Sequence, residues 1–105
     1  MNKSDEFARA LVGVTLRQYH TASLGGSFQK VLEFHPNVCA YYEIHRDTMG
    51  GGYTTDPEQG QWTASGNFPM GQVQIKWVDG SATSHTIEYH GGNSCRFDGV
   101  VTAVE

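Results

Sequence analysis

The sequence predicts an all-β fold, an antiparallel meander of about eight short strands that closes into a small barrel, with a short N-terminal helix. Apolar and polar residues alternate with a period of two in several segments, which is typical of strands with one buried face. Turns rich in Gly separate these segments; Gly accounts for 13 of the 105 residues, and charged residues for only 17%. Strands joined by short links pair antiparallel, and a meander with one apolar face buries that face best by curling into a barrel. The length fits one domain, residues 1–105.

Charge and composition exclude several classes of function. The formal net charge is −4, and the seven Lys and Arg residues are scattered, whereas a nucleic-acid surface needs clustered basic residues. The sequence contains no apolar run long enough to span a bilayer, and residues 1–10 are too polar for a signal peptide. We therefore expect a cytoplasmic protein that binds neither nucleic acid nor membrane. The two cysteines, Cys39 and Cys95, fit a reducing compartment and are expected to stay free.

The first predicted element is the helix, placed within residues 1–12. Ser4 or Asp5 is a candidate N-cap, and the apolar residues that follow suit one buried helix face. Gly13 is expected to end the helix, and Val14 to His20 alternates as a first strand.

The next two strands, Phe28 to His35 and Cys39 to Arg46, are predicted to form a hairpin. A three-residue turn, Pro36-Asn37-Val38, places Tyr42 opposite Leu32 on the inner face. The turn asks Val38 for a positive φ, which a β-branched residue disfavours.

After a long loop, Asp47 to Gly60, a strand containing Trp62 leads into the second hairpin, Gly71 to Tyr89. Asp79-Gly80 is a strong hairpin signal. A two-residue loop would place the apolar residues of the two strands on opposite faces of the sheet. We therefore predict a three-residue loop, Val78-Asp79-Gly80, with Gly80 left-handed and His85 on the inner face. Two short C-terminal strands, Cys95 to Phe97 and Val100 to Val104, complete the meander.

The order of several motifs resembles the small bacterial lipocalin-like (calycin-like) domains. These motifs are Lys30-Val-Leu-Glu-Phe-His-Pro-Asn, Tyr41-Tyr42, a glycine-rich loop, Gly60-Gln-Trp62, Val73-Gln-Ile, Asp79-Gly80 and Phe97-Asp98-Gly99. Val38 stands where that family has its turn glycine. The Gly-x-Trp pair, which true lipocalins have in their first strand, is here in the middle of the chain. The resemblance implies a small meander barrel that binds a ligand or a partner.

The predicted inner face contains the candidate site, since a few polar groups in an apolar barrel mouth can orient a ligand. We predict a non-enzymatic binding module that holds a small apolar or amphipathic ligand. The expected ligand-binding residues are Tyr42, Trp62, Trp77, His85 and Lys30.

Two other functions remain open. One is a protein-interaction domain, of immunity or inhibitor type, acting through its outer loops; the other, ranked lowest, is a small enzyme that uses His85 as acid or base. A cavity favours the ligand binder, because an interaction domain can be packed solid. The identity of the ligand or partner and the oligomeric state stay open.

Other chemistry is disfavoured. Among the five histidines, His35 with Cys39 is the one plausible metal-binding pair, and two ligands do not make a zinc site. The same pair lacks a readable oxyanion hole or third orienting group for nucleophilic catalysis. We therefore expect no catalytic residues, no metal and no cofactor.

Overall fold

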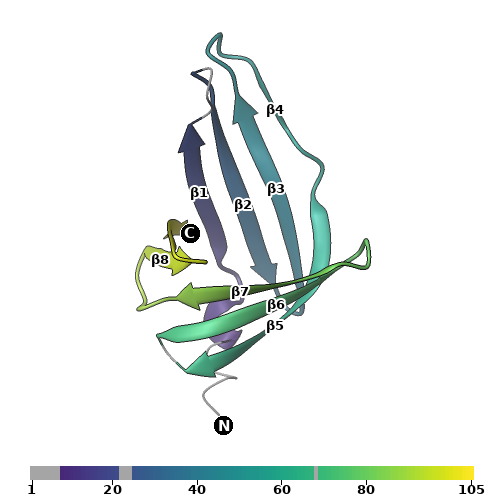
Figure 1. The fold of residues 1–105 in the computed structure, drawn as a ribbon, viewed down its shortest axis with the longest axis vertical. Helices are drawn as coiled ribbons and strands as arrows, with labels where there is room; N and C mark the ends of the chain where they lie inside the picture. Colours follow the sequence, from purple (N-terminus) through teal and green to yellow (C-terminus); the bar gives the residue numbers. More distant parts are fainter. Residues whose placement is uncertain (1–7, 22–24, 68) are drawn as a thin grey trace.

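The computed structural model describes residues 8–21, 25–67 and 69–105, and in this part of the chain nine β-strands form one antiparallel sheet (Figure 1). In chain order they are β1 Thr15–Thr21, β2 Ser27–His35, β3 Val38–Arg46, β4 Gly52–Thr54, β5 Glu58–Asn67, β6 Met70–Trp77, β7 Ala82–Glu88, β8 Ser94–Phe97 and β9 Val100–Val104.

Eight of these strands close into a barrel, as the alternation and turns predict. The order around the barrel is β1-β2-β3-β5-β6-β7-β8-β9, and β9 returns to β1 through the pairs Leu16–Val104 and Arg17–Ala103. The predicted all-β meander barrel is therefore confirmed. The ninth strand, β4, lies within the predicted long loop and extends the sheet along β3.

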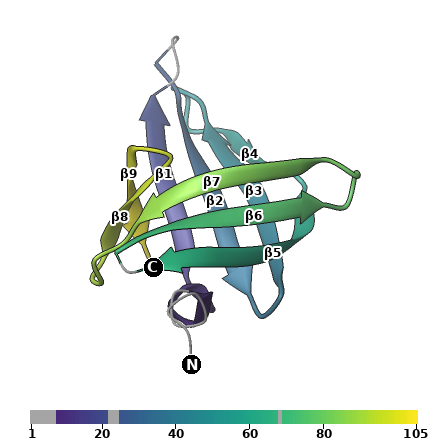
Figure 2. The same ribbon diagram turned by 60° about the horizontal axis from the view of Figure 1, so that its bottom comes forward.

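A short helix over residues 8–11 covers one end of the barrel (Figure 2). Gly13, with a φ of 84°, ends it, and its backbone N–H donates to the carbonyl of Phe34 at 2.8 Å. Leu11 is 1% exposed because it packs into the core of the barrel. The predicted end of the helix is confirmed, while the candidate caps Ser4 and Asp5 lie outside the described residues.

The hairpin of β6 and β7 has the predicted register. Gly80 is left-handed, with a φ of 95°, and the N–H of Trp77 donates to the carbonyl of Ser81 at 2.8 Å across the three-residue loop. Val73 lies opposite His85, so both side chains are on the inner face.

The hairpin of β2 and β3 differs from the prediction by one residue. His35 pairs with Val38, so the loop is the two residues Pro36 and Asn37, and Asn37 adopts the positive φ of 65°. Asn tolerates this conformation far better than a β-branched residue does, and Pro is suited to the position before it. The slip exchanges the two faces of β3.

Tyr42 is consequently on the outer face, and its predicted inward position is wrong. It lies opposite Val31, which is fully buried although it faces away from the barrel interior. The Tyr42 hydroxyl donates to Glu33 at 2.9 Å, while Arg17, on the other side of Val31, forms an ion pair with Glu105 at 3.0 Å. Amphipathic side chains can cover an apolar residue while keeping their polar ends in water, and here Tyr42 and Arg17 flank the buried Val31.

The barrel has walls of unequal height. Figure 1 shows β1, β2, β3 and β4 rising well beyond the level at which β5, β6 and β7 run across them. We call the inner face of residues 18–21, 27–30, 43–46 and 52–54 the upper wall. We call the buried cluster nearest the helix the floor: Leu11, Phe34, Cys39, Trp62, Val73, Ile87 and Cys95.

Candidate ligand-binding site

The floor closes one end of the barrel with apolar side chains. Phe34 and Trp62 meet edge to face with ring centroids 4.9 Å apart, and Phe34 is 1% exposed. The Trp62 indole N–H donates to the carbonyl of His35 at 2.7 Å, so its polar atom is satisfied inside the core. This end has the packing of a protein interior.

Above the floor lies an open cavity of about 530 Å³, within the range of small-molecule sites. Leu16, Leu32 and Ile75 belong both to the core and to the cavity wall. Further apolar surface comes from Trp77, Phe97 and Val100. The cavity therefore offers a mostly apolar surface bordered by polar groups.

Gly60 allows Trp77 to occupy this position. It is buried on β5 opposite Trp77, and a Cβ atom there would lie 3.2 Å from the Trp77 ring and 2.8 Å from Ile75. Any larger residue at this position would push the indole away from the wall.

A chain of hydrogen bonds runs along one side of the cavity from Trp77 to Asp98. The Trp77 indole can only donate, so Thr83 Oγ1 accepts at 2.9 Å, and the Thr83 hydroxyl hydrogen is left to donate to His85 Nε2 at 2.9 Å. His85 Nδ1 then carries the proton and donates to Asp98 Oδ2 at 2.7 Å. Asp98 Oδ1 accepts from the backbone N–H of Thr86 at 2.9 Å. Each of these groups is thus satisfied by the protein itself.

Gln18 on β1 and Thr102 on β9 form a second group of polar side chains that satisfy one another. Gln18 donates from Nε2 to Thr102 Oγ1 at 3.0 Å, and Thr102, which is 1% exposed, donates to the carbonyl of Val100 at 2.9 Å. Gln18 Oε1 contacts His20 Nε2 at 3.3 Å. These bonds fix Gln18 and Thr102 against the wall.

Glu43 forms the third polar cluster, on β3. One carboxylate oxygen accepts a short hydrogen bond from the Tyr41 hydroxyl, and the other lies 2.9 Å from His45 Nε2. These two bonds, from Tyr41 first and His45 second, hold the pKa of Glu43 below its ordinary value. Burial, followed by the bond to Glu43, raises the pKa of Tyr41.

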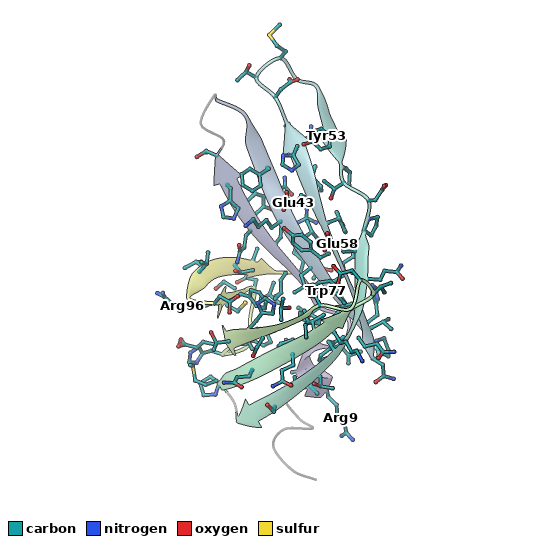
Figure 3. The ribbon with its side chains drawn as sticks, turned by 45° about the vertical axis from the view of Figure 1, so that its right-hand side comes forward. Arg9, Glu43, Tyr53, Glu58, Trp77 and Arg96 are labelled. Atoms are coloured by element: carbon teal, nitrogen blue, oxygen red, sulfur yellow. The ribbon has the colours of Figure 1, made fainter. Side chains whose placement is uncertain are left out.

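Four stacked rings lie along the upper wall, beyond the residues that line the cavity. His20 stacks on Phe28 with centroids 4.9 Å apart, Phe28 on His45 at 5.3 Å, and His45 on Tyr53 at 4.8 Å. The four residues come from β1, β2, β3 and β4, and the ring spacing matches that of neighbouring strands. In Figure 3, Tyr53 lies near the end of the upper wall that is farthest from the N-terminal helix. Glu43, Glu58 and Trp77 lie successively closer to the helix end of the barrel.

The structure brings together three of the five predicted site residues. Lys30, Trp77 and His85 line the cavity. Trp62 lies below it in the floor, and Tyr42 is on the outer face. Tyr41, which sequence reasoning missed, lines the cavity instead of Tyr42. Asn37 was the signal that could have found it, because its tolerance of positive φ favours the shorter turn.

Cys39 and Cys95 are free and buried, and burial raises the pKa of both thiols, that of Cys95 to about 11. Within residues 8–21, 25–67 and 69–105, no cluster of three or more His, Cys, Asp or Glu residues could hold a metal ion. Among the helices of the same residues, none is long and apolar enough to cross a membrane.

Comparison with protein-family models, with curated proteins and with solved structures found no match. The class of protein is accordingly defined by its architecture, a small antiparallel meander barrel with an open, mostly apolar cavity.

Proposed function

We propose that this protein is a binding module that holds a small amphipathic ligand in the cavity of the barrel. The observation that carries the proposal is the open cavity of about 530 Å³ between the floor and the upper wall. Its apolar surface suits the body of a ligand, and its polar border suits a head group. A protein that acted only through its outer loops would have no need to leave this volume open.

The difference in polarity between the floor and the upper wall supports one orientation of the ligand in the cavity. The floor is apolar and closed, so the apolar body points towards Leu16, Leu32 and Ile75. The polar head then lies nearer the upper wall, where ionisable side chains gather. His85 contributes to the shape of the wall, because both of its ring nitrogens already have partners.

The two tryptophans allow a direct test. Trp62→Phe leaves Trp77 as the reporter in the cavity, whereas Trp77→Phe leaves Trp62 as the reporter in the floor. Titration with the neutral amphiphile 1-octanol should change the emission of Trp77 and leave that of Trp62 largely unchanged.

A pair of matched valines tests the place of binding. Val100 lines the cavity and Val101 faces away from it, and both are exposed enough, at 45% and 66%, to accept a larger side chain. Val100→Phe should weaken octanol binding about tenfold by filling the mouth, and Val101→Phe should leave it unchanged. Equal behaviour of the two variants, or no binding to either tryptophan variant, would argue against the proposal.

A further inference from the structure

Two charged side chains on the cavity wall, Lys30 and Glu58, have no hydrogen-bond or ion-pair partner within the described part of the chain. The neighbouring polar groups differ in this respect. Gln18 is bound to Thr102, and His85 to Asp98. Among the described residues that line the cavity, one positive and one negative side chain are therefore available to a ligand.

The two charges lie on either side of the Tyr41–Glu43 pair. Lys30 on β2 is opposite Glu43 on β3, and Glu58 on β5 is opposite Tyr41. Both oxygens of Glu43 are occupied, by Tyr41 and by His45, and Lys30 is not within ion-pair distance of them. Ordinary strand spacing puts the Cα atoms of Lys30 and Glu58 roughly 12 Å apart, which leaves room for a head group between the side-chain ends.

The charges of Lys30 and Glu58 affect the pKa values of Glu43 and Tyr41, which lie between them. After the hydrogen bonds from Tyr41 and His45, the positive charge of Lys30 contributes to the lowered pKa of Glu43. After burial and the bond to Glu43, the negative charge of Glu58 contributes to the raised pKa of Tyr41. A head group above this pair would therefore meet a field directed from Lys30 to Glu58.

We infer that the ligand has a zwitterionic head, with its anionic group bound by Lys30 and its cationic group by Glu58. This inference rests on the proposed binding function and adds the chemical class of the ligand. A ligand with a single charge would use one of the two side chains and leave the other unpaired, whereas a zwitterion pairs both.

The two contacts should differ in strength. Lys30 is half-buried, while Glu58 is exposed at the rim of the cavity. Water and salt screen an exposed charge more strongly, so Lys30 should contribute more to affinity than Glu58.

Three probes that share one octyl chain test the head group. Octylamine carries an ammonium, nonanoate carries a carboxylate, and 2-aminodecanoate carries both on the same chain. Calorimetric titration at low salt, at concentrations below micelle formation, should give an affinity for 2-aminodecanoate about tenfold above that for either other probe.

Two variants and two matched controls separate the local contacts from the overall charge. Lys30→Gln should lower the affinity for 2-aminodecanoate about tenfold, and Glu58→Gln about threefold. Lys76→Gln and Asp56→Asn make the same changes of charge at exposed positions outside the cavity wall, and both should leave the affinity unchanged.

The outcomes test separately whether the ligand is zwitterionic and whether the cavity binds a ligand. Equal affinity for the three probes, or equal losses in the variants and their controls, would overturn the zwitterion and leave the binding function standing. If neither these probes nor octanol bind, the binding function itself fails, and the inference fails with it.

Discussion

The two ends of the barrel interior use the same strands for different purposes. On β2, Phe34 lies in the floor and is 1% exposed, whereas Phe28, six residues earlier on the same face, lies half-buried in a row of stacked rings on the upper wall. The two phenylalanines differ in exposure because different elements face them across the barrel interior. The helix and β5 to β7 cover the floor, while the upper wall extends beyond the strands that run across it (Figure 1). An alternating strand thus supplies buried core where a second layer covers it and a partly exposed inner surface where none does.

The largest expected effect comes from truncating the two phenylalanines. Phe34→Ala should lower the free energy of unfolding by about 3–5 kcal/mol, because it opens a void in a tightly packed floor. Phe28→Ala, the matched change on the upper wall, should cost less than half as much, because its surroundings are already open to water. Urea denaturation of both variants measures the difference. Similar losses would mean that the upper wall is packed like the floor.

A smaller effect is expected at the boundary between the two ends, where Gly60 makes room for Trp77. Gly60→Ala places a Cβ atom 2.8 Å from Ile75 and 2.9 Å from the carbonyl of Lys76. Overpacking of this kind costs about 1–3 kcal/mol and should also shift the emission of Trp77 when Trp62 is replaced by Phe. Gln59→Ala, at the exposed neighbouring position, serves as the control. If Gly60→Ala leaves both stability and emission unchanged, the close approach of Trp77 to β5 is wrong.

The smallest effect concerns Glu43, whose pKa the bonds from Tyr41 and His45 hold below its ordinary value of 4.5. Because the folded pKa is the lower one, Glu43 stabilises the protein above pH 4.5, and this contribution is lost as the pH falls through the folded pKa. The contribution should be under about 1 kcal/mol. Stability should therefore fall less between pH 6 and pH 3 in Glu43→Gln than in the unaltered protein, as measured by urea denaturation.

Tyr41→Phe removes the stronger of the two bonds to Glu43 and should reduce the same pH dependence. An unchanged slope in both variants would show that Glu43 does not titrate differently in the folded protein.

The two main hairpins show which features of the fold could be predicted from the sequence and which could not. In β6 and β7, the apolar alternation and a Gly at the left-handed position favour the same register, and the prediction is confirmed. In β2 and β3, apolar pairing favoured Tyr42 inside, whereas turn geometry favoured Asn37 in the left-handed conformation. The structure has the register that turn geometry favours, because a positive φ is costly for the β-branched Val38 and not for Asn37, and Tyr42 lies outside against Val31.

By itself, the sequence determined the eight strands of the barrel, their meander order, the end of the helix at Gly13 and the inner position of His85, because these depend on local alternation and on turn residues. The tertiary structure alone decided the height of the upper wall, the stack of rings from His20 to Tyr53 and the pairing of His85 with Asp98. It also decided that, among the described residues, Lys30 and Glu58 have no hydrogen-bond or ion-pair partner, whereas Tyr41 and Glu43 between them are bonded. These features join residues of different strands and turns, and their contacts depend on register and barrel closure, which no local pattern contains.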